Sequence, residues 1–121
     1  MPKPLAELAK TSAADLVGVI FDIDDTVTRD GRLEAAAFSA MHELAASGLR
    51  LIAVTGRPLG WSDVAAHLWP VEMGVGENGA GWAWRVGATM HHGYYQSDAE
   101  RMTSRGLLDE VRQAVETEMP E

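Results

Sequence analysis

The fold is decided by the stretch Val17-Gly18-Val19-Ile20-Phe21-Asp22-Ile23-Asp24-Asp25-Thr26, in which an apolar run leads directly into three carboxylates and a hydroxyl. Residues 17–21 have the continuous, β-branched character of a strand that is covered on both faces, as in the parallel sheets of α/β proteins. Ligands of such sheets bind outside the carboxyl ends of the strands. Alternation along an extended chain sends Asp22 and Asp24 to one side and Ile23 to the other.

Asp22 and Asp24 are like charges that need a neutralising cation if they lie side by side. A hard divalent ion is suited to oxygen ligands, and Mg²⁺ usually takes one or two protein carboxylates together with waters and a substrate phosphate. The alternative is that the acidic cluster only solvates a strand end and caps a turn, because Asp and Thr favour such positions.

Length and charge narrow the class of protein. The chain has 121 residues, which is about one domain and small for an α/β enzyme. Its formal net charge of -8, from 18 acidic and 10 basic residues, argues against nucleic acid as a partner but leaves room for a small phosphorylated substrate. The absence of cysteine excludes disulfides, thiolate metal sites and cysteine nucleophiles.

The first ten residues bear on the cellular location of the protein. Residues 1–10 contain prolines, lysines and Glu7 in place of the apolar segment of a signal peptide, and no stretch of the sequence is suited to span a bilayer. We therefore expect a cytoplasmic protein without a membrane partner. Residues 1–15 are expected to form a leader with a short helical tendency, in which Leu5, Leu8 and Ala9 make one apolar stripe.

The order of predicted elements is that of a doubly wound α/β protein. Asp30-Gly31 predicts a hairpin turn in a small flap after the acidic stretch. The remaining elements are a helix over 33–47 ended by Gly48, a buried strand over 49–54, a helix from about 59 to 67, a third strand at about 71–75, a hairpin of strands 81–87 and 89–95, and a helix over 98–118 with Ser97 as its N-cap.

Thr55-Gly56-Arg57-Pro58 follows the second strand and places a hydroxyl, a glycine and a cation just before a helix. Backbone N–H groups and the helix dipole favour an anion there, and Thr55 can donate a further hydrogen bond to a phosphoryl oxygen. By itself the segment is better explained as a plain β–α turn, with Gly for the geometry and Pro at the first helical position. Two neighbouring parallel strands, however, bring acidic residues and a phosphate-type loop to one sheet edge, which favours the binding site.

These motifs resemble those of a known family. Asp22-Ile23-Asp24-Asp25-Thr26 and Val54-Thr55-Gly56-Arg57-Pro58 are similar to motifs I and II of the haloacid dehalogenase-like (HAD) hydrolases, and Glu77-Asn78-Gly79-Ala80 is similar to the N-G-A turn of their subfamily IIB. That subfamily includes Cof-type and sucrose-phosphate phosphatases. The resemblance covers about residues 17–80 and implies a Rossmann-like, three-layer α/β/α parallel sheet.

The resemblance also implies a role for each matching residue. Asp22 becomes the nucleophile and Asp24 the general acid and base, with Mg²⁺ held by the Asp22 carboxylate and the Asp24 carbonyl. The phosphoryl oxygens are assigned to Thr55 and Gly56, with Arg57 and Asn78 as further phosphate-binding residues. Asp22 can attack without a base because a carboxylate with a pKa near about 3.9 is ionised at neutral pH. Asp24 can protonate an alkoxide leaving group, which favours phosphate-ester hydrolysis over dehalogenation.

The sequence departs from the family after Ala80, because the motif III lysine and the motif IV acidic residues are not evident. We therefore expect the N-terminal portion of a longer protein: a leader over 1–15, a partial HAD-like core with flap and hairpin over 16–96, and a helix over 97–121 leading toward a cap domain. Such a chain could form a homo-oligomer or associate with the missing C-terminal part. The alternatives to a phosphatase are a non-catalytic phosphate-binding or interaction module and a phosphosugar mutase.

Other polar and aromatic residues have simpler interpretations. Asn78 serves either the turn geometry or the substrate, and the sequence does not choose between them. The adjacent pair His91-His92 would point to opposite faces of a strand, which opposes a shared metal ion. The four tryptophans are expected in core or interface packing.

Overall fold

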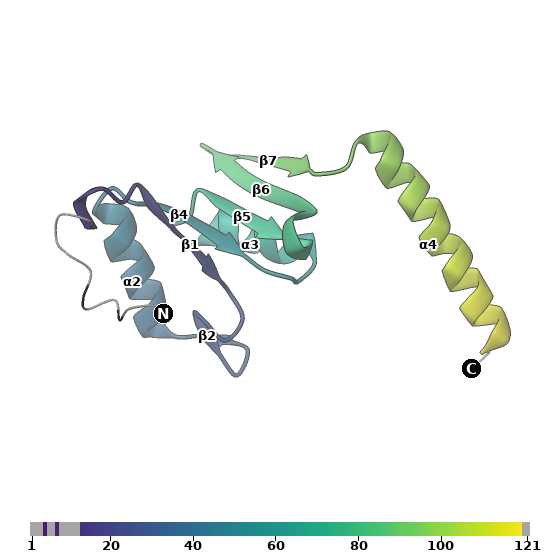
Figure 1. Cartoon of the computed structure of the whole chain (residues 1–121), viewed down its shortest axis with the longest axis horizontal. Coiled ribbons are helices and arrows are strands. Elements are labelled where there is room, and N and C mark those ends of the chain that lie inside the picture. The colour runs from purple at the N-terminus through teal and green to yellow at the C-terminus, as the bar shows by residue number, and fades with distance from the viewer. Residues whose placement is uncertain (1–3, 5–6, 8–12, 120–121) are drawn as a thin grey trace.

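The computed structural model describes residues 4, 7 and 13–119, and the predicted leader stripe of Leu5, Leu8 and Ala9 lies outside them. Figure 1 shows a twisted sheet with helices packed on it and one long helix extending away. The elements in chain order are β1 (Gly18–Asp22), β2 (Thr28–Arg29), β3 (Arg32–Leu33), α2 (Ala35–Ala46), β4 (Arg50–Val54), α3 (Leu59–Leu68), β5 (Met73–Gly76), the 3-10 turn η2 (Glu77–Gly79), β6 (Gly81–Val86), β7 (Thr89–Tyr94) and α4 (Asp98–Glu118).

The main sheet has the strand order β1-β4-β5-β6-β7. β1, β4 and β5 are parallel, whereas β6 and β7 add to the sheet as an antiparallel hairpin. The predicted β–α–β crossovers and the hairpin around Gly87-Ala88 are therefore confirmed. The predicted flap is also present as the separate pair β2 and β3, whose connecting turn holds Asp30 and Gly31 at φ 51° and 73°.

Helix ends follow the local chemistry of the sequence. Gly48 follows α2 with φ 91°, a conformation that glycine adopts without a steric cost, and it confirms the predicted end of that helix. α4 begins with a capping box in which the Ser97 hydroxyl accepts from the Glu100 amide and the Glu100 carboxylate accepts from the Ser97 amide. The predicted Ser97 N-cap is thus confirmed.

α3 packs closely against β5 and β6 and covers one face of the sheet. The backbones approach closely at Gly74, where a Cβ atom would lie 2.5 Å from the Ser62 carbonyl oxygen. Ala53 of β4 and Ala65 of α3 are buried together with Ile23, which follows β1. Small residues at these positions let the helix sit directly on the strands, and the burial of Ile23 fixes the chain just before the acidic turn.

The other face of the sheet is only partly covered. Buried and half-buried residues alternate along β4, β5 and β6, which is the pattern of a sheet with one covered face. β1 is an edge strand of the sheet that the described residues form, and Ile20 is 69% exposed while the preceding Val17 is 79% exposed. The prediction that residues 17–21 are covered on both faces is therefore wrong for this chain. An apolar run shows that a strand suits burial, but it does not show that the covering layer is present.

The Rossmann-like α/β class is confirmed, in the incomplete form that the sequence predicts. α4 extends away from the sheet in Figure 1, and its apolar side chains at Leu107, Leu108, Val111 and Val115 are exposed. The division into a core over 16–96 and a segment over 97–121 stays a prediction. Within the described part of the chain, no helix is both long enough and apolar enough to cross a bilayer.

Candidate functional site

Three strand ends come together at one edge of the sheet. Asp22 ends β1, Thr55 follows β4, and Asn78 lies in the turn after β5. A cavity of about 360 Å³ opens there, and four of the six predicted site residues line it; the full lining is Asp22, Val54, Thr55, Gly56, Val75, Asn78 and Gly79. The other two predicted residues, Asp24 and Arg57, lie beside this cavity and contact Thr55.

Asp22 offers an available carboxylate to the cavity. Its side chain is exposed, and among the described residues it accepts no hydrogen bond and forms no ion pair. A carboxylate in such surroundings is open to a cation or an electrophile. Among the described residues the Asp22 carboxylate therefore has no side-chain partner, in contrast to the carboxylate of Asp24.

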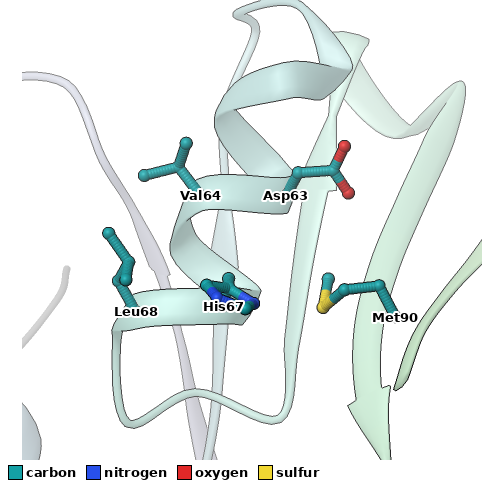
Figure 2. A pocket seen from close by; sticks show the side chains of 5 residues that line it. All are labelled: Asp63, Val64, His67, Leu68 and Met90. Atoms are coloured by element: carbon teal, nitrogen blue, oxygen red, sulfur yellow. The ribbon is translucent and has the colours of Figure 1, made fainter. Parts of the chain in front are cut away.

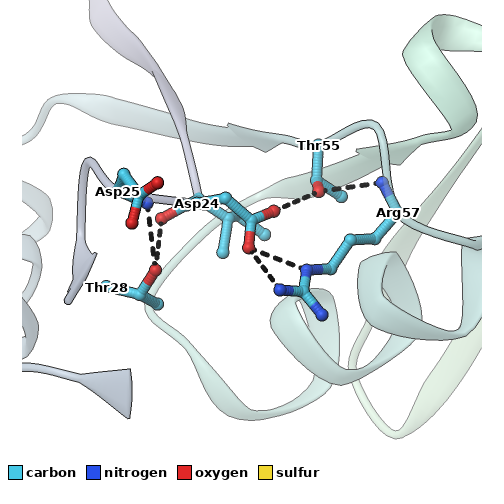
Figure 3. Close-up of polar contacts among 6 residues, drawn as sticks. Asp24, Asp25, Thr28, Thr55 and Arg57 are labelled. Carbon is cyan, nitrogen blue, oxygen red and sulfur yellow. Dashed lines mark hydrogen bonds and ion pairs between the residues drawn. The ribbon is translucent and has the colours of Figure 1, made fainter. Parts of the chain in front are cut away.

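The chain turns sharply after Asp22, so the strand that we expected to extend to Asp24 ends two residues before it. The Ile23 carbonyl accepts hydrogen bonds from the Val27 and Thr28 amides and from the Thr28 hydroxyl, which is 3.1 Å away. The same hydroxyl accepts from the Asp25 amide at 3.2 Å (Figure 3). Asp25 holds a left-handed conformation in this turn, with φ 55°.

Thr28 is thus a residue of the site that the sequence did not indicate. Its hydroxyl joins both sides of the acidic turn and so fixes where the backbone places Asp24 and Asp25. The available signal was the preference of Thr for turns, which is too general to single out one hydroxyl.

Asp24 is engaged by two partners that come from the end of β4 (Figure 3). The Nε and Nη2 atoms of Arg57 each lie 2.7 Å from its Oδ1 atom, and the Thr55 hydroxyl donates to its Oδ2 atom at 3.2 Å. The Arg57 amide in turn donates to the Thr55 hydroxyl at 3.0 Å. Both oxygens of this carboxylate therefore have donors within the chain.

These contacts shift the ionisation of both partners. The hydrogen bond from Arg57 holds the pKa of Asp24 below its ordinary value, with a smaller contribution from Thr55, and partial desolvation opposes the change. The same hydrogen bond, with the charge of Asp24, raises the pKa of Arg57. Asp24 is thus an ionised carboxylate at neutral pH in this arrangement.

Trp61 completes the surroundings of Arg57. The guanidinium carbon lies 4.6 Å from the centroid of the Trp61 ring, within the range of a cation–π contact. Trp61 stands in the first turn of α3 and is 44% exposed. It was expected to pack in a core or an interface, whereas the structure gives it a charged neighbour at the site.

Gly56 and Asn78 are close neighbours in the cavity wall. A Cβ atom on Gly56 would lie 3.1 Å from the Asn78 Oδ1 atom, so glycine lets the two segments approach. The Asn78 amide donates to the Thr55 carbonyl, and Asn78 itself adopts φ 54°. Asn78 therefore holds the left-handed turn and lines the cavity as well.

The start of α3 already holds an anionic group. The Glu77 carboxylate accepts a hydrogen bond from the Leu59 amide at 3.3 Å, and the Glu77 amide donates to the Arg57 carbonyl. Sequence reasoning did not identify this cap, since Glu77 lies 18 residues after Leu59. The Leu59 amide at the start of α3 is therefore already engaged, which leaves Thr55 and Gly56 as the nearer groups for an incoming anion.

The acidic residues suit a hard cation with few protein ligands. Over the described residues there is no cluster of three or more His, Cys, Asp and Glu side chains that could hold a metal ion. Asp22 supplies a free carboxylate, which matches the one or two protein ligands that Mg²⁺ usually takes. The histidine pair is separated as expected: His91 stacks on Trp84, whereas His92 lies 2.6 Å from Asp63 on the α3 side.

A second hollow lies apart from this site. Figure 2 shows it along the C-terminal half of α3, and its lining residues are Asp63, Val64, His67 and Leu68 of α3 with Met90 of β7. Its volume is about 290 Å³ and its lining is almost entirely apolar. It includes none of the six predicted site residues, so we assign it no part in the chemistry at the strand ends.

Comparison with known proteins supports the same fold. No protein-family model matches the chain, and a search of curated proteins finds no significant match. Among solved structures, the chain is similar to BT1666 from Bacteroides thetaiotaomicron, described among phosphatases of the HAD enzyme superfamily, with a TM-score of 0.56 and 19% sequence identity. The match covers 88% of this chain and 40% of BT1666, so the chain spans less than half of that protein. The chain therefore shares an α/β core fold with BT1666 over most of its own length.

Proposed function

We propose that the chain carries the nucleophile and phosphoryl-binding part of a Mg²⁺-dependent phosphomonoester hydrolase, which acts through an aspartyl-phosphate on a small phosphorylated metabolite such as a sugar phosphate. One observation carries the proposal: the free carboxylate of Asp22 shares a cavity with Thr55, Gly56 and Asn78 at the carboxyl edge of the parallel strands. The fold of a HAD-superfamily phosphatase supports it.

The residues present account for both halves of the reaction. Asp22 attacks phosphorus, so that an O–P bond forms to its carboxylate and the ester P–O bond breaks, while Asp24, which must first take up a proton, gives that proton to the departing oxygen. Asp24 then takes a proton from the water that attacks the aspartyl-phosphate, which releases inorganic phosphate and restores Asp22. Thr55 and Gly56 hold the phosphoryl oxygens in place throughout.

Mg²⁺ suits this set of oxygen donors, and the Asp22 carboxylate and the Asp24 main-chain carbonyl would hold it. When bound, it would neutralise charge between Asp22 and the phosphoryl group and orient that group for attack. The Asp24 carboxylate itself is taken up by Arg57 and Thr55 in this structure. The assignment of Asp24 therefore concerns its carbonyl as a ligand and its side chain as an acid and base.

The test is Asp22→Asn in the full-length protein, assayed on an aryl phosphate with and without Mg²⁺. We expect a loss of turnover by several orders of magnitude, because the amide cannot form the covalent intermediate. Asp30→Asn is the matched control: it makes the same chemical change in the turn of the flap, where Asn-Gly is as well suited as Asp-Gly. Retained turnover in Asp22→Asn contradicts the nucleophile assignment.

Two further measurements, phosphate binding and product analysis with a second sugar as acceptor, separate the other interpretations of the site. Mg²⁺-dependent phosphate binding without turnover in the full-length protein would favour a non-catalytic module, and transfer to a second sugar would favour a mutase. As partners we propose the small phosphorylated substrate and, for the exposed edge of β1, either another copy or further polypeptide that associates with this chain.

A further inference from the structure

The two donor side chains assigned to the phosphoryl group already bind an anion within the chain. The Thr55 hydroxyl donates to one oxygen of Asp24, and Arg57 donates to the other through two nitrogens. A carboxylate and a phosphoryl group offer the same kind of oxygen acceptor to these donors. Asp24 therefore occupies, in this structure, the hydrogen bonds that a bound phosphoryl group would need.

Arg57 is held on two sides. Its guanidinium lies between the Asp24 carboxylate, with N–O distances of 2.7 Å, and the Trp61 ring, 4.6 Å from the guanidinium carbon. Arg57 and Trp61 lie near the start of α3 and Asp24 lies after β1, so the contact joins two separate segments of the site. A long, exposed arginine would otherwise sample many rotamers, and the ring restricts it to those that reach Asp24.

We propose that Trp61 is a positioning residue that holds Arg57 on Asp24 in the resting site, and that an incoming phosphoryl group takes over Arg57 and Thr55 and thereby releases the Asp24 side chain. The inference rests on the proposed function, since it assigns a phosphoryl group to this edge. To the proposed function it adds a role for Trp61 and an exchange of the hydrogen-bond acceptor of Arg57 and Thr55, from Asp24 to the phosphoryl group.

The exchange has a direct consequence for the reaction. While Arg57 and Thr55 bind both Asp24 oxygens, the carboxylate is engaged by the segment after β4 and is not free to take part in proton transfer. A phosphoryl dianion carries more charge than a carboxylate and suits the fork of donors on an arginine. Phosphoryl binding would therefore free Asp24 at the moment when the ester oxygen needs it.

The first part of the experiment measures how well the Arg57 side chain is protected from exchange with water when no substrate or metal is present. Exchange of the Arg57 Nε–H with water is followed by ¹⁵N NMR in the wild-type chain, and Arg57→Lys identifies the signal. We expect faster exchange in Trp61→Leu, by about twofold to fivefold as for the loss of an exposed cation–π contact, and near wild-type exchange in Trp61→Phe, which keeps an aromatic face. Val64→Ala is the control, because Val64 lies on α3 with a similar exposure, 47% against 44% for Trp61, and has no aromatic ring that could stack on a guanidinium.

The second part measures the binding of inorganic phosphate. In the wild-type chain, phosphate is titrated while the Arg57 signal is followed, and calorimetry compares the phosphate affinities of the wild type and Asp24→Asn. We expect Asp24→Asn to bind phosphate roughly tenfold more tightly than wild type, because a competing charge a few ångströms away is removed. Exchange in Trp61→Leu that equals exchange in wild type, or phosphate affinity that Asp24→Asn leaves unchanged, would overturn the proposal. Neither result depends on turnover, so the hydrolase assignment stands or falls separately with Asp22→Asn.

Discussion

The Thr55 hydroxyl donates a hydrogen bond to the Asp24 carboxylate across 3.2 Å, although the two residues are 31 positions apart in the sequence. The parallel pairing of β1 and β4 explains this proximity, since Asp22 is in register with Val54 and both strands end at the same edge. The hydrogen bond therefore links the two motifs on which the proposed chemistry depends, before any ligand is present.

The Asp24–Arg57 pair predicts a pH-dependent contribution to stability. The pKa of Asp24 is lower in the folded chain than in the unfolded chain, so the pair stabilises the fold above the unfolded pKa, and this contribution is lost as the pH falls through the folded pKa. Arg57→Gln should lower the melting temperature slightly at neutral pH, because the pair is exposed, and this deficit should shrink as the pH falls through the folded pKa of Asp24. Thermal unfolding monitored by circular dichroism measures this. A deficit that persists unchanged at low pH would mean that Arg57 stabilises the fold by other contacts.

The close packing of α3 on β5 predicts a strong effect at Gly74. In Gly74→Ala the new Cβ would meet the backbone of Ser62, which cannot move aside as a side chain could. We expect a loss of roughly 1–3 kcal/mol in the free energy of unfolding, typical of overpacking. Gly60→Ala is the matched control, because a Cβ there meets nothing within 4 Å and an α-helix favours alanine. Urea denaturation of both variants checks the prediction, and equal stability of the two would contradict the packing argument.

The sequence predicted the elements of the core well because their signals are local. The apolar runs before Asp22 and Thr55, the turn at Asp30-Gly31 and the cap at Ser97 each depend on neighbouring residues only. Parallel pairing then brings the strand ends together without further information. This is why four predicted site residues line one cavity.

What the sequence could not predict are the contacts that depend on three-dimensional distance. Asp24 lies beyond the end of β1, so strand alternation no longer governs its direction, and its pairing with Arg57 follows from the turn that Thr28 stabilises. The Glu77 cap on α3 joins residues from different elements in the same way. The half-covered sheet face escapes prediction for another reason, because hydrophobicity reports the suitability of a face for burial and not the presence of its partner.

The exposed edge of β1 predicts association through this strand. Ile20 is apolar and largely exposed on an edge whose backbone groups have no partner strand within the described sheet. Ile20→Lys should leave the free energy of unfolding within about 0.5 kcal/mol of wild type and should reduce concentration-dependent self-association. Sedimentation velocity measures this, with Val111→Lys on the exposed face of α4 as the matched comparison. Association that only Val111→Lys reduces would place the contact on α4.

Asn78 has two proposed roles, in the geometry of the turn and in substrate binding, and substitutions can separate them. Asn78→Gly keeps the left-handed conformation at φ 54° and removes the side-chain amide from the cavity, whereas Asn78→Ala loses the amide and also strains the turn by about 1 kcal/mol or more. We expect Asn78→Gly to unfold at nearly the same urea concentration as wild type and to bind inorganic phosphate several-fold more weakly. Unchanged phosphate affinity in Asn78→Gly, with lower stability in Asn78→Ala, would assign Asn78 to the turn alone. The side-chain amide of Asn78 would then contribute nothing to the binding of phosphate.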